Sequence, residues 1–185
     1  FVTMDTFIRH IHSLSYVKNF NEGDNKLILL CRNPKELLFR NNQIREVEDI
    51  RKKNINTFLK LYINRFKLYE LWNPEYRMCS FYEDIAEDLD SNLLQMIELL
   101  DEDPVYMDEF IKNKKENLDS IQKNYKKRYN NSCRSSENGV NLVYYSKGKD
   151  PELLRAIDTK LREMAPYIYD KYLKRFEYSV DMYGE

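Results

Sequence analysis

"QIREVEDIRKKNINTFLKLYINRFKLYELW", at residues 43–72, is the stretch that decides which fold class the sequence predicts. Apolar side chains recur through it three and four positions apart, as they do on one face of an α-helix. These side chains are Ile44, Val47, Ile50, Phe58, Leu61, Tyr62, Phe66, Tyr69 and Trp72. A segment of this length with one apolar face predicts a long amphipathic helix that packs against other helices.

The 185-residue chain contains only 4 Gly and 5 Pro. These few residues mark the ends of the other predicted helical segments. Helices are expected at residues 3–18, at 24–31 after the cap Asp24, from the capping box Ser80/Glu83 to Asp103, at 104–128, and at 150–180 with a kink at Pro166. The segment VNLVYY fits either a strand or a helical turn.

We therefore predict an all-α protein, an irregular helical bundle with a long antiparallel helical core. One helical domain is expected to span residues 1–185. Its parts are the long-helix core at 43–128, a loop region at 129–150 and a C-terminal helix at 150–180.

Charge is divided between two neighbouring segments of the chain. Twelve acidic residues and one basic residue lie between Glu75 and Glu109, whereas eight basic and two acidic residues lie between Lys112 and Arg134. A short link makes the two predicted helices antiparallel, and we expect their charges to pair within the molecule. An outward-facing basic patch that binds phosphate or sulfated glycan is the alternative. The net charge of −1 argues against a nucleic-acid partner.

The sequence lacks the motifs of known catalytic and metal sites. The two histidines, His10 and His12, lie two positions apart on a predicted helix and point to different sides. The three cysteines, Cys31, Cys79 and Cys133, are too few and too scattered for a C-x-x-C zinc site. We therefore predict a protein that is not an enzyme and that has no cofactor and no metal.

Aromatic side chains are concentrated in PYIYDKYLKRFEY, at residues 166–178. Tyrosine and arginine are enriched at the energetic centres of protein interfaces. The partner-binding residues predicted on this basis are Tyr167, Tyr169, Tyr172, Arg175 and Tyr178. The alternative is a core stripe accompanied by ordinary surface tyrosines.

Three stretches of the sequence are similar to Plasmodium helical surface antigens. They are NKLILLCRNP at 25–34, ELWNPEYRMCSFYEDIAEDLD at 70–90 and NKKENLDSIQKNYKKRY at 113–129. These stretches most resemble the extracellular N-terminal domains of the SURFIN family. The resemblance implies a non-catalytic ectodomain, extracellular or exported to the surface of the parasite or infected cell. It would act in host-surface binding or as a variant antigen, with a host or parasite protein as partner.

A second interpretation is an intracellular viral or parasite adaptor, located in the cytoplasm, that binds a host protein. The chain opens with Phe1 and not with Met, so we expect a fragment of a longer protein and a membrane anchor outside it. The oxidation state of the cysteines distinguishes the two interpretations, because disulfides persist outside the cytoplasm.

A disulfide between Cys79 and Cys133 follows from the predicted helical hairpin. Two antiparallel helices of equal length return Cys133 to the level of Cys79, just before Ser80. The long run at 43–72 places Cys31 near the opposite end, where we expect it to be buried and free.

Replacing Cys133 by Ser should lower the melting temperature and expose the Cys79 thiol to alkylation, because a cross-link of this kind stabilises by up to ~4 kcal/mol. Thermal unfolding and intact mass with and without reductant measure both effects. Three free thiols in the unreduced protein would contradict the disulfide and the ectodomain interpretation together.

Overall fold

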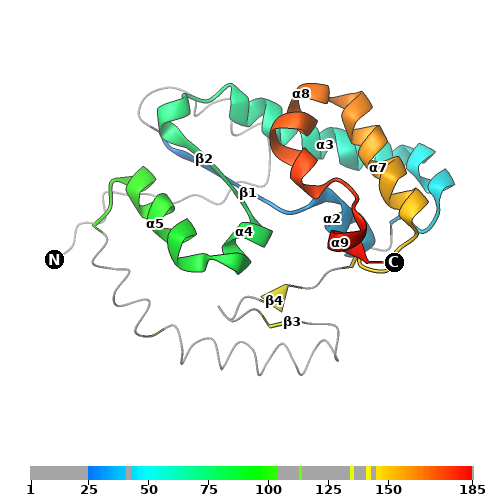
Figure 1. The fold of residues 1–185 in the computed structure, drawn as a ribbon. Helices are drawn as coiled ribbons and strands as arrows, with labels where there is room; N and C mark the ends of the chain where they lie inside the picture. Colours follow the sequence, from blue (N-terminus) through cyan, green and yellow to red (C-terminus); the bar gives the residue numbers. More distant parts are fainter. Residues whose placement is uncertain are drawn as a thin grey trace.

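The computed structural model describes residues 25–40, 43–103, 113, 134–135, 141–142 and 145–184 (Figure 1). Of the described residues, 69% are helical, which confirms the predicted helical majority. The elements in chain order are β1 (Leu27–Cys31), α2 (Pro34–Arg40), η1 (Val47–Arg51), α3 (Lys53–Glu70), η2 (Pro74–Tyr76), β2 (Arg77–Phe81), α4 (Tyr82–Glu87), α5 (Leu89–Leu100), β3 (Arg134–Ser135), β4 (Asn141–Leu142), α7 (Pro151–Met164), α8 (Pro166–Ile168), η3 (Tyr169–Leu173), η4 (Lys174–Phe176) and α9 (Val180–Tyr183).

A parallel pair of strands, β1 and β2, shows that the protein is not purely α-helical. Leu29 pairs with Cys79, and Leu30 pairs with Ser80. The helix expected at residues 24–31 is therefore wrong over β1, because a short apolar run such as LILLC has no periodicity that separates a strand from a buried helix.

The predicted capping box at Ser80 is also wrong. Ser80 is the fourth residue of β2, and its hydroxyl donates to Asn92 Oδ1 at 2.7 Å. The helix begins two residues later with α4, and Asp88 then separates α4 from α5. The Asp88 side chain accepts from the backbone N–H of Ser91 at 3.0 Å, so α5 has its own N-terminal cap.

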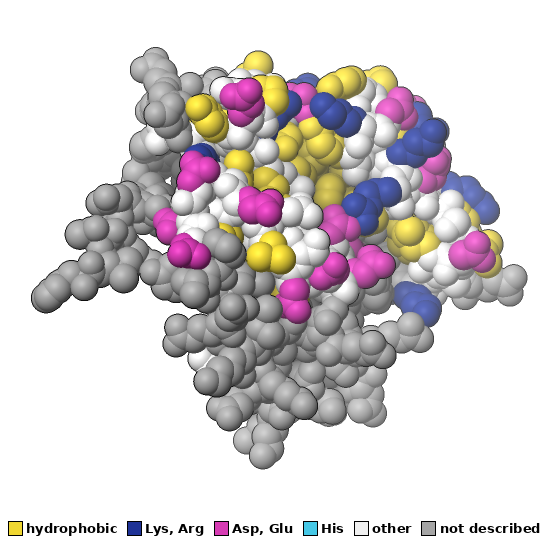
Figure 2. Space-filling model, turned by 60° about the vertical axis from the view of Figure 1, so that its left-hand side comes forward, with side chains coloured by type: hydrophobic (Ala, Val, Ile, Leu, Met, Phe, Trp, Pro, Cys, Tyr) yellow, Lys and Arg dark blue, Asp and Glu magenta, His cyan; other side chains and the backbone are white. Residues whose placement is uncertain are grey.

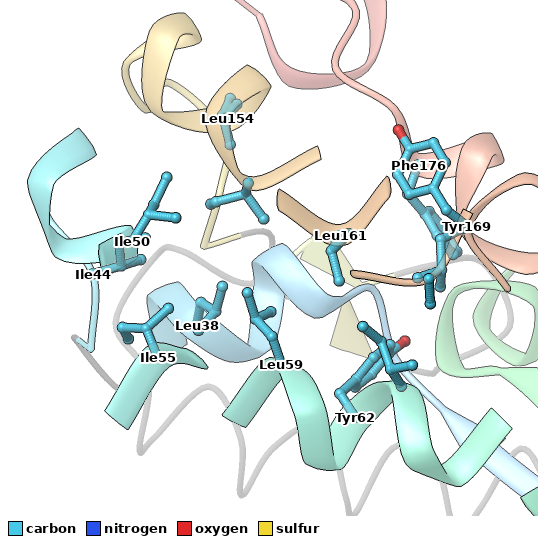
Figure 3. Close-up of a cluster of buried hydrophobic side chains, with 14 of the residues drawn as sticks. Leu38, Ile44, Ile50, Ile55, Leu59, Tyr62, Leu154, Leu161, Tyr169 and Phe176 are labelled. Atoms are coloured by element: carbon cyan, nitrogen blue, oxygen red, sulfur yellow. The ribbon is translucent and has the colours of Figure 1, made fainter. Parts of the chain in front are cut away.

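The connection between the parallel strands runs through α2, η1 and α3. A parallel pair requires such a crossover, since a tight turn can only join antiparallel strands. In Figure 1 the strand pair lies between α3, α7 and α8 on one side and α4 and α5 on the other. Figure 3 shows the core on the first side, where Leu59 of α3 and Leu161 of α7 point toward one another.

The long run at 43–72 forms a shorter helix than predicted. Residues 43–46 are not helical, and Lys52 is extended with ψ 143°, so that η1 and α3 are separate. The Asp49 carboxylate accepts from the backbone N–H of Arg45 at 2.7 Å, which holds this non-helical entry in place. The predicted helix is confirmed for α3, but Leu61 is 49% exposed although it was expected on the buried face.

The start of the C-terminal helix agrees with the prediction. Asp150 accepts from the backbone N–H of Glu152 at 2.9 Å, and Pro151 occupies the first turn of α7. The predicted kink at Pro166 is confirmed as a break, because Ala165 adopts φ −158° and ψ 77° in front of it. The helical run ends with η4, before the predicted limit of residue 180.

Two further predictions are decided only in part by the described residues. Residues 141–142 of VNLVYY form β4, which pairs antiparallel with β3, so the strand interpretation is right at these positions. The predicted helices at 3–18 and 104–128 lie outside the described residues apart from residue 113, and with them the second half of the antiparallel core. Within the described part of the chain, no helix has the length and apolar character needed to cross a membrane.

Replacing Leu59 by Ala should lower the free energy of unfolding by about 2–5 kcal/mol, because Leu59 is fully buried. Replacing Leu61 by Ala should change it by less than about 0.5 kcal/mol, since half of that side chain already faces solvent. Urea denaturation of both variants measures the difference. Equal losses at the two positions would mean that α3 presents a different face to the core.

Candidate functional site

The carboxyl ends of β1 and β2 meet at one edge of the strand pair, because parallel strands run in the same direction. Arg32 and Asn33 follow β1 there, and Tyr82 and Glu83 follow β2. In open α/β sheets, ligands bind in the crevice outside the carboxyl ends of the strands. This edge is therefore a candidate binding site.

Glu83 occupies the centre of this edge. Both of its carboxylate oxygens accept from the backbone N–H of Asn33, at 3.1 and 3.3 Å, and Arg32 Nε lies 3.8 Å from Glu83 Oε1. The two charged side chains are only 14% and 11% exposed. A negatively charged oxygen pair is thus held by a hydrogen bond from one backbone N–H and by an ion pair with one guanidinium, the groups that proteins use for oxyanions.

Burial raises the pKa of the Glu83 carboxyl above its usual value. The backbone hydrogen bonds and the charge of Arg32 lower that pKa, but they offset the burial only in part. The ionised form of the carboxylate is consequently less stable in this site than it would be in water.

Two aromatic rings flank Arg32. The guanidinium carbon lies 5.1 Å from the centre of the Tyr82 ring and 5.8 Å from that of Tyr145. Such contacts hold the plane of a guanidinium in place and leave its edge for hydrogen bonding. We refer to Arg32, Asn33, Tyr82, Glu83 and Tyr145 as the strand-edge site.

Asn33 lies directly before α2 and connects this helix to the C-terminal end of the described residues. Its Oδ1 accepts from the backbone N–H of Lys35 at 3.0 Å, and its Nδ2 donates to the Tyr183 hydroxyl at 2.9 Å. The Tyr183 hydroxyl in turn donates to the Phe176 carbonyl at 2.7 Å. The backbone N–H that holds Glu83 is therefore fixed from two directions.

Lys35 forms a buried ion pair with Asp158 of α7. Its ammonium also donates to the Phe176 carbonyl at 2.5 Å, and Asp158 Oδ2 accepts from the backbone N–H of Tyr178 at 2.9 Å. Burial lowers the pKa of Lys35 and raises that of Asp158, and the charge of each partner opposes the shift. Because Lys35 is only 1% exposed, it holds the fold together and cannot reach a ligand.

Glu36 fixes the segment that carries Tyr145. Its carboxylate accepts from the backbone N–H of Tyr145 at 2.5 Å, and from both the backbone N–H and the hydroxyl of Ser146. Glu36 is fully buried, so these donors replace the water that it has lost. The ring of Tyr145 is thereby placed against Arg32.

The predicted partner-binding residues make mostly internal contacts. Tyr169 is fully buried, and the Tyr172 ring lies 5.0 Å from that of Phe66. Arg175 Nη1 donates to Asp84 Oδ2 at 2.9 Å, the Tyr178 ring stacks on Tyr183 at 5.9 Å, and the Tyr167 side chain is 60% exposed. Tyr169, Tyr172 and Tyr178 fit the core alternative, whereas Arg175 and Tyr167 are exposed, and a partner-binding role stays a prediction.

The cysteines of the two strands lie close together. Cys31 and Cys79 are on the same face of the strand pair, and the hydrogen bond between their thiols together with burial raises the pKa of Cys31. The expectation that Cys31 lies at the opposite end from Cys79 is therefore wrong, because strand pairing brings them together. Cys31 is buried and free, as predicted, and Cys79 is also a free thiol. The free thiol of Cys79 gives no support to its predicted disulfide with Cys133, which stays a prediction because Cys133 lies outside the described residues.

Sequence reasoning did not identify the strand-edge site. The cap-and-proline pattern of Asn33-Pro34 gives a local sign of a helix start, but nothing near it indicates Glu83, 50 positions away. His10 and His12 lie outside the described residues. Among the described residues, no three His, Cys, Asp or Glu side chains form a group that could hold a metal ion.

Comparison with protein-family models, with curated proteins and with solved structures found no match to this chain.

Replacing Lys35 by Met should lower the free energy of unfolding by about 3–5 kcal/mol, because Asp158 would stay buried without its partner charge. Adding Asp158→Asn should restore much of this loss, since Asn can still accept from the backbone N–H of Tyr178. Urea denaturation of the single and double variants measures the recovery. A double variant no more stable than Lys35→Met alone would contradict the role of the ion pair.

Proposed function

We propose that the strand-edge site binds a small ligand that carries a phosphate or sulfate group, and that Glu83 takes the position of that group in the free protein. The observation that carries the proposal is the Glu83 carboxylate on the backbone N–H of Asn33 beside Arg32. Phosphate and sulfate oxygens use the same donors, and the arginine edge can donate to two oxygens at once.

Displacement of Glu83 by such a ligand has a physical basis in the burial of its carboxylate. Burial raises the pKa of Glu83, so the released carboxylate regains hydration that it lacks in the site. A phosphate dianion also attracts Arg32 more strongly than a monoanionic carboxylate does. Both effects favour exchange of the internal anion for an external one.

The rings beside Arg32 favour an ester of an aromatic or other flat group over a bare inorganic ion. Tyr82 and Tyr145 are both partly exposed and border the guanidinium. Tyrosine rings add apolar contact area and stacking to a site whose polar group supplies orientation. The expected ligand thus combines one oxyanion with a flat apolar part.

The roles predicted from the sequence concern where the protein acts and what partner it has. Host-surface binding by a non-catalytic ectodomain, and the alternative of an intracellular adaptor, are compatible with a ligand at this edge. They stay proposals, as does the absence of enzymatic activity. A bound oxyanion ligand would act in either setting by holding Arg32, α2 and α4 in one arrangement.

Replacing Glu83 by Gln should strengthen binding of phenyl phosphate at least about tenfold, because the competing internal charge is removed. The amide oxygen of Gln can still accept from Asn33, so the local fold is retained. Isothermal titration calorimetry with phenyl phosphate measures both proteins, and Glu87→Gln on the exposed side of α4 is the matched control.

Adding Arg32→Gln to the Glu83→Gln variant should abolish this binding. Absence of binding to the Glu83→Gln variant at millimolar phenyl phosphate, in a protein with unchanged circular dichroism, would contradict the proposal. An equal gain in the Glu87→Gln variant would contradict it too, because that gain would come from net charge alone.

Sulfate binding to the unaltered protein should strengthen as the pH falls through the raised pKa of Glu83. Below that pKa Glu83 is neutral and competes less for Arg32, whereas above it the carboxylate is charged and opposes the ligand. Sulfate is the suitable probe because its own charge is constant in mildly acidic solution. Calorimetry over this range measures the trend, and the Glu83→Gln variant should lose most of it.

A further inference from the structure

Helix α3 and the residues just before it carry charge of one sign. From residue 51 to residue 69 the chain contains no acidic residue and six basic ones, all of them exposed: Arg51, Lys52, Lys53, Lys60, Arg65 and Lys67. Lys52 pairs with Asp49. The last four of the six form no ion pair with any other described residue, so within the described part of the chain their charges face solvent.

Three of these lysines lie in one line along the helix. Lys53, Lys60 and Lys67 are seven residues apart, which is close to two full helical turns. They therefore follow one another on the same side of α3 at intervals of about 10.5 Å. The helix presents a regular row of positive charge, which a scatter of surface lysines would not produce.

An incomplete heptad pattern lies beside this row. Residues three and four apart share one face of a helix, and on this side of α3 they are Asn54, Thr57, Leu61, Asn64, Leu68 and the cap residue Leu71. Leu61 is 49% exposed and Leu71 is 71% exposed. These positions correspond to a and d of a two-stranded coiled coil, and the three lysines take the flanking positions that set partner choice. We refer to these six residues with the three lysines as the α3 outer face.

The acidic part of the molecule does not neutralise the α3 outer face. Residues 78–103 contain nine acidic residues and no Lys or Arg. Figure 2 shows Lys and Arg side chains mainly on the right-hand side of the described surface, whereas the left-hand side is mainly acidic. Three of the acidic residues pair with Lys26, Arg32 and Arg175, none of which belongs to α3.

We propose that the α3 outer face binds an acidic amphipathic helix of a partner protein. A partner helix with Glu or Asp at every seventh residue repeats its charge at the same interval as the lysine row. Its apolar side would cover Leu61, Leu68 and Leu71. The proposal does not depend on the strand-edge site, because the two sites share no residue.

The composition of the α3 outer face favours a helix over other anionic partners. Insertion into a membrane surface requires a continuous apolar face, but Asn54, Thr57 and Asn64 interrupt the leucines. A phosphate backbone would leave Leu61 and Leu71 without apolar contact. A second copy that docked through the same face would bring lysine rows together, which opposes a symmetric dimer.

A fluorescein-labelled synthetic helix of three heptads, with Leu at a and d and Glu at the flanking positions, tests this with the full chain. Fluorescence anisotropy should show saturable binding that weakens about tenfold in the Lys60→Glu variant, where attraction is replaced by repulsion. Lys147→Glu is the matched control, because Lys147 is exposed and lies beside Gly184. An equal loss in both variants would overturn the proposal, since the peptide would then respond only to overall charge.

The apolar part of the contact has its own pair of variants. Leu61→Gln should also weaken binding about tenfold, because it removes apolar contact without changing the charge. Leu30→Gln is the matched control, since Leu30 is 60% exposed on β1. It should bind the peptide as the unaltered protein does, and equal binding by these two variants would contradict the predicted position of the helix.

Three further measurements test the other occupants. A peptide of the same composition, with its residues reordered so that no heptad remains, should not bind, and equal binding would overturn the proposal. Binding to phosphatidylserine vesicles but not to the heptad peptide would overturn it in favour of a membrane surface. A dimer of the unaltered protein in sedimentation, lost in Lys60→Glu, would overturn it by making a second copy the occupant.

Discussion

Parallel pairing of β1 with β2 imposes the constraint from which the rest of the structure follows. Parallel strands cannot be joined by a tight turn, so the chain between them must leave the strand pair and return along one face. Helices α2 and α3 make that return, and the buried face of α3 then supplies the surface on which α7 and α8 pack. The same pairing brings Arg32 and Glu83 together at one edge, although they are far apart in the sequence.

Four consecutive residues, Asn33 and the first three of α2, connect the strand pair to the C-terminal segment at residues 145–184. Asn33 contacts Tyr183, Lys35 pairs with Asp158, Glu36 holds the Tyr145 segment, and Pro34 fixes the first helical turn between them. Burying so many polar groups is unfavourable unless each one is satisfied, and here each charge has a partner or several donors. These contacts favour a single position of the C-terminal segment on α2. Apolar side chains could still pack after a small displacement of the segment, whereas these hydrogen bonds and the ion pair would be broken.

Sequence patterns predicted the helices that are long enough to show a repeating apolar pattern or that have capping and proline residues at their ends. Helix α3 follows from helical spacing, and α7 follows from Asp150-Pro151 and from Pro166 after its end. The strands could not be predicted in this way, because LILLC and RMCSF are five residues each and acquire their identity only by pairing with one another. The strand-edge site was missed for the same reason, since it exists only after the two strand ends have met.

Glu83 and Asp84 are neighbours in the first turn of α4, but their carboxylates contact different parts of the protein. Successive residues of a helix point about 100° apart. Glu83 consequently turns toward Asn33 and Arg32, where it is nearly buried, while Asp84 turns toward Arg175 of η4 and stays partly exposed. The ion pair of Asp84 with Arg175 fixes α4 to the C-terminal segment independently of Glu83. An external anion could therefore displace the Glu83 side chain without releasing α4, which is the property that a carboxylate needs if it is to give way to a ligand.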